Sequence, residues 1–395
     1  MDDLLILLVL LVSSRSALVN FADAFQIAVL ALALGVWLLR GGGLAVAFLG
    51  FCLASLLWLS LHAFLDNAVS ARTWAGHFLR PFTAALVVGC VSRPLDRLAA
   101  WVVRLAVLSL VLFPLGLILP GLIERLHALT PEALRFVGGT MVGETLTGSW
   151  RRASWLVYTF SPDRPHQNHG FMWEPAAFGM VLALGLWARI LSGRYRFDRA
   201  NLVLLAAMLS TFSTTAWLGA MASAGFMLWR HGGGARLALV YLLPVLALAG
   251  VTLEFLAPKI AAEFSAGYRP QMQWSLSRMA SFELDMAELA EAPLLGQGIV
   301  TEARAPRLPS NNGLSDFLVR YGLLMSLGAL ALLLASLHRL YRPGPGAMAA
   351  FLLTLTIFGW AEKFLELPLF YLWLFAGFSA VPSPAAASAE PARAY

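Results

Sequence analysis

The chain has little charge. Only 13% of its 395 residues are Asp, Glu, Lys or Arg, which is about half the share found in an ordinary soluble domain. Together with 59% hydrophobic residues, this shortage excludes a soluble globular enzyme, because the apolar surplus is too large for a core to bury. Most of the apolar surface is therefore expected to face lipid, and the length of the chain limits the number of membrane spans.

Cysteine and lysine are also scarce. Cys52 and Cys90 both lie in apolar runs, so they can form neither a disulfide framework nor a cysteine zinc cluster, and we expect buried packing residues. Lys259 and Lys363 are the only lysines among 28 basic residues. The high arginine content as a whole is explained by a GC-rich genome. We consider phosphate binding only for individual arginines whose position in the sequence suggests it. They form no basic stripe, which argues against nucleic-acid binding.

Apolar runs and their charged breaks predict about twelve membrane spans. The runs lie at 3–12, 17–39, 44–61, 78–92, 98–119, 171–190, 201–212, 214–229, 237–256, 314–337, 347–361 and 367–381. Several are shorter than the ~20 residues of a straight spanning helix, so loop charge must support the count. The loops at Arg40, 93–97, 189–199, 230–236 and 338–342 are rich in arginine, which predicts that they are cytoplasmic. The first run begins with acidic residues, unlike a secretory signal, and is expected to be a short retained span.

This topology requires two apolar stretches to break. An even number of crossings between cytoplasmic loops means that 201–229 crosses twice, and the polar residues of 211–215 mark the break. Glu362, Lys363 and Glu366 mark a similar break in the last stretch. Both breaks should lie on the outer side, where protein or water can satisfy the freed backbone groups. For 362–366, a tight hairpin between two thin spans is the alternative to a functional break.

The expected fold is all-α: a polytopic integral membrane protein whose residues 1–381 form a single transmembrane domain. Two longer segments, 120–170 and 257–312, are expected in the periplasm. The tail 382–395, rich in Pro, Ala and Ser, is expected to be disordered and cytoplasmic.

Within the second outer segment, the spacing predicts a helix over 274–291. Its apolar stripe should lie on the membrane surface or cap the bundle, and it comprises Met279, Phe282, Met286 and Leu289. An adjacent stripe is polar and comprises Arg278, Ser281, Asp285 and Glu288. Pro293 should end the helix before the turn LLGQGI. The lone GxG in this turn is weak support for a nucleotide site.

The sequence RPHQNHGFMWEPAAFG, residues 164–179, leads from the first outer segment into a span. Pro175 suits the first turn of a helix, so Glu174 should stand at or near its cap. A helix N-terminus favours anions, which should keep Glu174 ionised or help to hold a phosphate beside it. A helix cap paired with an arginine is the alternative. His166 and His169 lack an HExxH motif and a third ligand, so we expect no metal site and treat both as surface or interface histidines.

The sequence SNNGLSDFLVRYG, residues 310–322, begins another span. Asn311 and Asn312 stand just before it, where side-chain amides can bind hydroxyl-rich ligands. Turn formation and helix capping are the alternative.

Three stretches carry a family resemblance. FMWEPAAFG, SRMASFELDMAELAEAPLLGQGI and SNNGLSDFLVRYG occur in the same order as in the bacterial O-antigen polymerase and ligase superfamily. With the twelve-span pattern, the chain resembles a Wzy-type polysaccharide polymerase over roughly residues 20–380, which implies a GT-C-like membrane fold. STTAWLGA, residues 213–220, resembles the family's Ser-Arg-Gly turn, although Thr and Ala replace its Arg and Gly.

The resemblance implies a glycosyltransferase that extends a surface polysaccharide. The donor would be an undecaprenyl-pyrophosphate-linked glycan, and transfer would need neither a metal nor another cofactor. The reaction would take place at the periplasmic face of the bacterial inner membrane. Membrane lipids, a chain-length regulator and a flippase are the further partners it implies. Asn311 stands where the ligase branch carries a histidine, which favours a polymerase over a ligase that transfers polymer to lipid A core.

Candidate residues follow from this reaction. The departing pyrophosphate needs fixed cations, and guanidinium forks match phosphate oxygens. Arg278 is the first candidate, followed by Arg80, beside Pro81 at the outer end of a span, and Arg164; for each, anchoring to lipid headgroups is the alternative. Glu174 is preferred to His169 as general base because it lies at the membrane edge.

A rival from another class is a secondary transporter or flippase. It would use the broken helices near 213 and 362 as a midplane substrate site. Such a protein should show paired repeats and intramembrane charges. The sequence has no internal repeat, and its polar residues gather in the outer segments instead.

Overall fold

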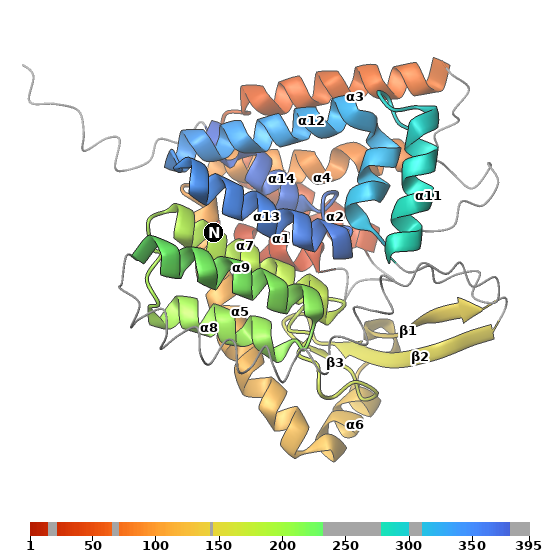
Figure 1. Ribbon diagram of the computed structural model, residues 1–395, viewed down its shortest axis with the longest axis vertical. Coiled ribbons are helices and arrows are strands. Elements are labelled where there is room, and N and C mark those ends of the chain that lie inside the picture. The colour runs from red at the N-terminus through yellow and green to blue at the C-terminus, as the bar shows by residue number, and fades with distance from the viewer. Residues whose placement is uncertain (15–21, 65–70, 143–144, 232–277, 300–309, 380–395) are drawn as a thin grey trace, which may run out of the picture.

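The computed structural model describes residues 1–14, 22–64, 71–142, 145–231, 278–299 and 310–379 (Figure 1). The first helices are α1 (Asp2–Ser13), α2 (Ala22–Arg40), α3 (Val46–Phe64), α4 (Ala71–Cys90), α5 (Pro94–Ile118) and α6 (Pro120–Leu129). The later ones are α7 (Pro175–Leu191), α8 (Arg199–Ser210), α9 (Thr214–His231), α11 (Arg278–Glu291), α12 (Gly313–Tyr341), α13 (Pro345–Ala361) and α14 (Pro368–Phe375). Short 3-10 turns are η1 (Glu132–Leu134) and η2 (Ala376–Phe378). The expected run 237–256 and the tail 382–395 lie outside the described residues.

The chain is a largely helical protein with candidate membrane spans. Among the described helices, four are long and apolar enough to cross a membrane: Asp23–Arg40 in α2, then α3, α5 and α12. The helices α7, α8, α13 and α14 are apolar but shorter. A count of twelve crossings therefore stays a prediction.

The first outer segment contains a sheet that the all-α expectation omitted. Strands β1 (Arg135–Val142), β2 (Thr145–Ser154) and β3 (Thr159–Phe160) form an antiparallel sheet in the order β1-β2-β3. Their short runs are rich in β-branched and aromatic residues, which suit a pleated surface better than a helix. The sheet and α6 project from the helical bundle (Figure 1).

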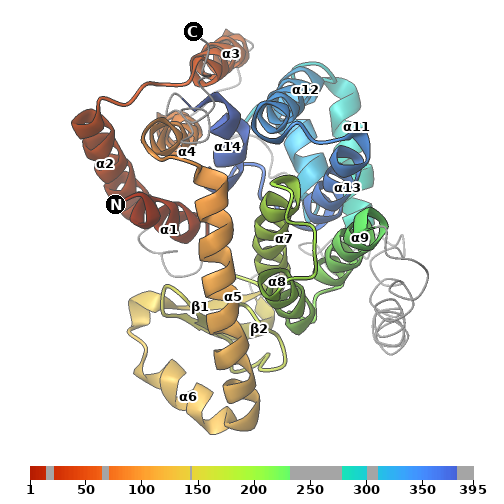
Figure 2. The ribbon, with the colours of Figure 1, turned by 90° about the vertical axis from the view of Figure 1, so that its left-hand side faces the viewer.

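Helix α7 lies at the centre of the bundle. Nearly all of its side chains are buried, and it packs against α5, α8 and α9. A helix that is apolar on all sides is typical of such a position. In Figure 2 most helices are seen nearly end-on, whereas α5 runs across the view and crosses the bundle obliquely. Helix α5 can approach α7 closely at Gly185 because glycine has no Cβ atom. A Cβ atom there would lie only 2.7 Å from a Val102 methyl group.

Both predicted breaks are confirmed. Helix α8 ends at Ser210 and α9 begins at Thr214, with Phe212 at a positive φ of 50° between them. Helix α13 ends at Ala361, and α14 begins only at Pro368. The 210–213 turn meets the segment before α7, because the Asn168 backbone N–H donates to the Ser210 carbonyl at 3.1 Å. We call this end of the bundle the Glu174 end.

The opposite end of the bundle, which we call the basic end, collects the arginine-rich loops at Arg40, 93–97, 189–199 and 338–342. Arg97 donates to the Asp3 carboxylate at 3.0 Å, and Arg189 pairs with Asp198 at 2.6 Å. Arg40 donates to the Cys90 carbonyl at 2.8 Å. Helices α7 and α12 both begin at the Glu174 end and finish at the basic end.

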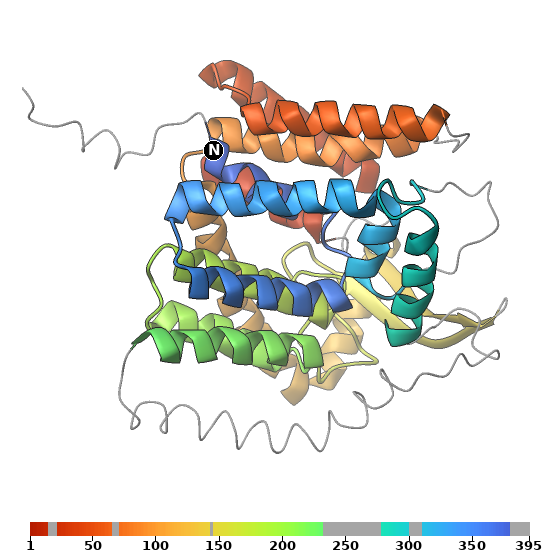
Figure 3. The ribbon, with the colours of Figure 1, turned by 45° about the horizontal axis from the view of Figure 1, so that its top comes forward.

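Helix α12 is interrupted near its start, and the GQG turn fills the interruption. Gly322 has a non-helical conformation with a φ of 69°. The ribbon of α12 bends sharply near its start (Figure 3). The Gln297 backbone N–H donates to the Val319 carbonyl at 2.7 Å, and the Leu323 N–H donates to the Pro293 carbonyl at 2.9 Å. The turn thus satisfies backbone groups that the break would otherwise leave without partners. The structure gives the GxG sequence this structural role.

Substitution of Gly322 tests this arrangement. In Gly322→Ala, the Cβ atom would lie 2.4 Å from both the Gly296 nitrogen and the Leu294 carbonyl oxygen, at a φ that disfavours L side chains. We expect a loss of about 2–4 kcal/mol in the free energy of unfolding, from backbone strain and overpacking. The matched control Gly328→Ala lies in the same helix with nothing within 4 Å, and should be neutral or slightly stabilising. Thermal unfolding in detergent measures both, and equal melting temperatures would contradict the packing described.

Candidate functional site

Glu174 stands where the sequence predicts it. It is the N-cap residue of α7, followed by Pro175 in the first turn. Its side chain makes no capping hydrogen bond to that turn, all of which the structure describes. The half-buried carboxylate instead accepts a 2.8 Å hydrogen bond from the indole nitrogen of Trp173. The side chain therefore does not serve as the helix cap that was the alternative.

A buried arginine that the sequence analysis missed lies beside Glu174. Arg152, on β2, has only 4% of its surface exposed, and its guanidinium donates to the Trp173 carbonyl. Successive side chains of a strand point to opposite faces, so the neighbouring Arg151 faces solvent. Arg151 pairs there with Asp163 at 2.8 Å. The sequence alone did not single out Arg152, because the segment was expected to be a loop. Only in a strand do two adjacent arginines point to opposite faces, one buried and one exposed.

Arg152 and Arg164 place two guanidinium charges near Glu174, with the buried His169 beside them. Burial lowers the pKa of Arg152 to about 10; Glu174 opposes this shift, whereas the Arg164 charge adds to it. Burial also lowers the pKa of Arg164, again opposed by Glu174. Burial, with the charges of Arg152 and Arg164, lowers the pKa of His169 to about 3. Two guanidinium groups and a neutral imidazole thus lie around Glu174, and a bound anion would stabilise the two guanidinium charges.

His169 is not the surface or interface histidine that the sequence analysis expected. It is 1% exposed, whereas His166 is exposed. The reason is the packing of 161–174 over the helix ends. Next to His169, the Asn168 side chain donates to Ser109 at 3.1 Å and to Ser210 at 2.9 Å, which holds this segment down on α5 and α8.

An ion-pair network surrounds the turn between α13 and α14. Arg80 and Arg320 lie 3.7 and 3.3 Å from the Glu366 carboxylate. Arg320 and Lys363 lie 2.9 and 3.3 Å from the Asp316 carboxylate. The 362–366 break is therefore more than a tight hairpin, since its charged residues form ion pairs with residues of α4 and α12.

The helix that carries Arg80 begins earlier than the predicted run 78–92. Helix α4 already begins at Ala71, so Arg80 and Pro81 lie within it. The added first half of the helix is stabilised by aromatic packing. His77 lies with ring centroids 6.2 Å from Trp58 and 5.8 Å from Tyr321.

Asn312 is the N-cap of α12, as the capping alternative proposed. Its side-chain oxygen accepts from the N–H groups of Leu314 and Ser315, each at 3.1 Å. Its buried amide nitrogen has no hydrogen-bond partner among the residues that the structure describes. Asn311 is exposed, and its backbone N–H donates to the Ser281 hydroxyl at 3.1 Å.

Helix α11 buries two residues of its polar stripe, Ser281 and Asp285, in addition to Leu289 of its apolar stripe. It stands across the start of α12 (Figure 3). Asp285 is 3% exposed and accepts hydrogen bonds from the hydroxyls of Ser310, at 2.6 Å, and Ser315. Phe282 of the apolar stripe is half-buried against Trp360, with ring centroids 5.0 Å apart. The hydroxyl partners of Asp285 explain why a carboxylate can occupy the buried face.

The 362–366 turn lies between the residues around Glu174 and the start of α12. Glu362 is close enough to Arg152 to act on it electrostatically. A Cβ atom at Gly313 would lie 2.0 Å from the Glu362 carbonyl oxygen, so the start of α12 touches the turn. Of the predicted site residues, Glu174, His169 and Arg164 come together, and Arg80 reaches the same turn through Glu366. Arg278, the first residue of α11, belongs with Asn311 and Asn312 in the group formed by α11 and the start of α12.

The chemistry of the site is that of fixed charges and amides. In the part of the chain that the structure describes, no three His, Cys, Asp or Glu side chains gather as a possible metal site. Comparison with known proteins finds no relative: no family model, curated protein or solved structure matches the chain.

Proposed function

We propose that the chain is a polysaccharide polymerase of the O-antigen polymerase and ligase superfamily. The three stretches that carry the resemblance lie far apart in the sequence. In the structure they form the start of α7, the helix α11 with its turn, and the start of α12, and charged residues of the 362–366 turn lie close to two of them. Their meeting at one end of the bundle supports a shared role in one reaction.

The observation that carries the proposal is the pair of buried or half-buried arginines, Arg152 and Arg164, that interact electrostatically with Glu174. Burial disfavours the charged form of both guanidinium groups, so a bound anion would stabilise their charges. A pyrophosphate is an anion of the right class, and arginine forks bind its oxygens in pairs. Arg152 and Arg164 would then stabilise the charge that develops as the lipid pyrophosphate leaves.

Glu174 is the general base in this proposal. Its carboxylate takes the proton of an acceptor hydroxyl while the hydroxyl oxygen attacks the anomeric carbon of the donor glycan. The bond from that carbon to the pyrophosphate oxygen breaks, and undecaprenyl pyrophosphate departs with the electron pair. His169 is a poor base, because an imidazole with a pKa of about 3 binds a proton weakly at neutral pH. Its role is to pack the segment that holds Arg164 and Glu174.

The reaction would take place at the periplasmic face of the bacterial inner membrane. The arginine-rich loops gather at the basic end, and cytoplasmic loops are typically rich in arginine. The Glu174 end would then face the periplasm, where lipid-linked repeat units are presented. Glycans on undecaprenyl pyrophosphate are the partners this requires, with a flippase to deliver them and a chain-length regulator.

The lipid profile of a deletion strain tests the proposed function. Without the gene, we expect lipid-linked or core-linked single repeat units to accumulate and long polysaccharide to disappear, because no repeat is joined to another. Long chains that are not attached to lipid A core would instead indicate the ligase reaction. An unchanged profile of both products would contradict membership of this pathway.

A further inference from the structure

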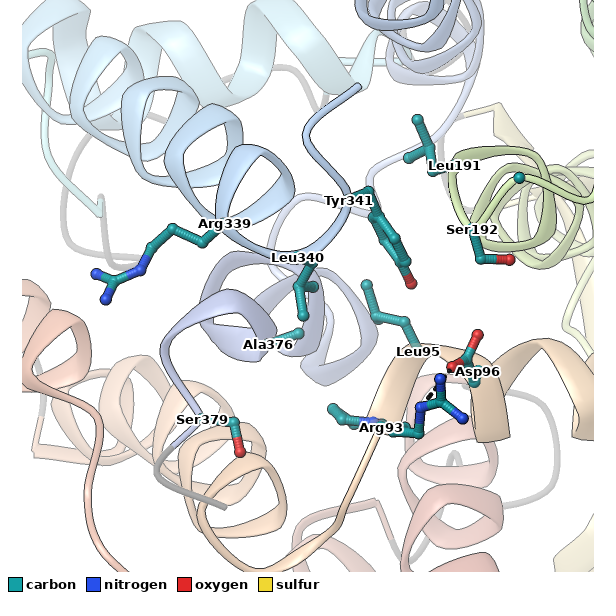
Figure 4. A pocket seen from close by; sticks show the side chains of 12 residues that line it. Arg93, Leu95, Asp96, Leu191, Ser192, Arg339, Leu340, Tyr341, Ala376 and Ser379 are labelled. Carbon is teal, nitrogen blue, oxygen red and sulfur yellow. Dashed lines mark ion pairs between the residues drawn. The ribbon is translucent and has the colours of Figure 1, made fainter. Parts of the chain in front are cut away.

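The two ends of the bundle differ in the surface that they present outside the proposed site. At the basic end a cavity of about 570 Å³ lies where α5 begins and where α7 and α12 end (Figure 4). Arg93 of its lining pairs with Asp96 at 3.4 Å, and the Arg339 guanidinium points away from it, so neither arginine directs a free charge into the cavity. At the Glu174 end, by contrast, the sheet exposes an apolar surface.

The turn between β2 and β3 exposes three consecutive apolar side chains. Trp155, Leu156 and Val157 keep 45%, 41% and 36% of their surface exposed. The turn is tight, because the Trp155 backbone N–H donates to the Tyr158 carbonyl at 2.8 Å. Turns are usually built from glycine and small polar residues, so an exposed apolar turn indicates a contact surface.

The backbone at Leu156 strengthens this indication. Its φ is 60°, at the first position of a two-residue hairpin loop, where glycine, asparagine or aspartate is preferred. A leucine in this conformation is strained, because its Cβ atom approaches the following carbonyl oxygen. Strained residues cluster at functional sites, so the leucine side chain is expected to have a role beyond closing the turn.

The turn is held firmly against α6. The Trp155 indole N–H donates to the hydroxyl of Thr130, the residue after α6, at 2.7 Å. The Trp155 ring also meets Phe160 edge to face, with ring centroids 5.4 Å apart. Behind the turn, Tyr158 and Phe160 form a small apolar core with Ile123 of α6. The exposed side chains are therefore presented in a fixed position.

Helix α6 extends the exposed apolar surface. Leu129, its last residue, is 76% exposed and directly precedes Thr130, the partner of Trp155. We call this surface the apolar tip; it comprises Leu129, Trp155, Leu156 and Val157. A rigid, exposed apolar surface of this kind marks a site of contact with lipid or with another protein.

The position of the apolar tip favours lipid. Helix α5 is a candidate membrane span, and α6 begins at Pro120 directly after α5 ends. Figure 2 shows α5 leading out of the bundle to α6. Ile118 and Leu119, at the junction of the two helices, are exposed apolar residues as well. The end of a span lies at the level of the lipid headgroups, where tryptophan is enriched because its ring is apolar and its N–H is polar.

We propose that the apolar tip inserts into the membrane leaflet at the Glu174 end and anchors the sheet there. Leu156 and Val157 contact acyl chains, while the Trp155 ring lies at headgroup level with its N–H bonded to Thr130. The anchor fixes β2, the strand that carries Arg152, relative to the membrane. The proposal does not depend on the polymerase reaction, since it concerns only the contact with lipid.

A fluorescent label at the tip tests the proposal. In the full-length chain with both native cysteines replaced by serine, Leu156→Cys would carry a nitrobenzoxadiazole label, in vesicles of phosphatidylethanolamine and phosphatidylglycerol. Interfacial apolar groups are buried about 5–10 Å at the headgroup boundary, so phosphatidylcholine with a nitroxide near its headgroup should reduce the fluorescence about two-fold or more. Iodide in the water should quench the label weakly.

The matched control is His166→Cys with the same label. His166 is an exposed residue of the same outer segment and lies outside the apolar tip. Its label should be quenched by iodide and much less by the nitroxide lipid. Val157→Cys provides a second labelling position without the strained φ of Leu156, which keeps the test valid if Leu156→Cys does not fold.

Two results would overturn the proposal. Quenching at the tip by iodide alone, as strong as at His166→Cys, would place the tip in water. Shielding of the tip from both quenchers would show that protein covers it, as a second copy of the chain would.

Discussion

Replacing Glu174 with glutamine should reduce polymer formation by about 100-fold or more, the usual scale for loss of a general base. Glutamine has nearly the same shape and can still accept the hydrogen bond from Trp173, so the fold and donor binding should persist. Glu174→Asp should keep part of the activity, because a shorter carboxylate can reach the acceptor through water. The measurement is polymer made from lipid-linked repeat units per molecule of purified, monodisperse enzyme.

Glu283→Gln is the matched control for this substitution. Glu283 is exposed on α11 and has no role in the proposed reaction. The variant should retain near-wild-type turnover and melt at an unchanged temperature. Near-wild-type turnover in Glu174→Gln would remove Glu174 from the reaction.

Substitution of Arg152 should have an effect of similar size. Arg152→Lys keeps the positive charge but loses the planar pair of donors, so its activity should fall nearly as far as that of Arg152→Gln. A decrease of about 100-fold or more is expected, as for the loss of a group that stabilises charge in a transition state. Stability should change less than activity, because burial already disfavours the charged guanidinium.

The neighbouring arginine provides the control. Arg151→Gln removes the same charge one residue away, from the solvent face of β2, where it pairs with Asp163 and Glu124. Exposed ion pairs contribute about 0–1 kcal/mol, so turnover should stay within about two-fold of wild type. Binding of the undecaprenyl pyrophosphate product separates the roles: Arg152→Gln should weaken it, and Arg151→Gln should not. Normal turnover in Arg152→Lys would show that only the positive charge of Arg152 matters and that its planar pair of donors is not needed.

Local patterns in the sequence predicted much of the helical framework. The break at 211–215 follows from the even number of crossings required between arginine-rich loops, and polar residues mark both this break and the one at 362–366. Glu174 at the start of α7 follows from Pro175, because proline suits the first turn of a helix. Both features depend on neighbours in the sequence, so no knowledge of tertiary contacts was needed.

The charged partners of the site could not be predicted in the same way. Arg152 acts on Glu174 only because β2 places it there, and a run of two arginines in a loop does not reveal a strand. Lys363 meets Asp316, and Glu366 meets Arg80, across wide gaps in the chain. Such pairs depend on how helices pack.

Helix α11 shows the limit of periodicity most clearly. Its apolar stripe was expected to lie on the membrane surface or cap the bundle, and Leu289 of that stripe is buried, but so are Ser281 and Asp285 of the polar stripe. Hydrophobic spacing identifies a helix and its two faces. It does not reveal hydroxyl partners elsewhere in the chain, and here Ser310 and Ser315 supply the partners that allow Asp285 to be buried.

Polymerisation by the wild-type chain itself is the most direct test of the account. The purified protein would be placed in liposomes with undecaprenyl-pyrophosphate-linked repeat units and a metal chelator, and the products would be separated by length. The account predicts a ladder of glycans that lengthens with time, with undecaprenyl pyrophosphate released for each unit joined. Repeat units that remain single, with no pyrophosphate-linked lipid released, would contradict the proposed function.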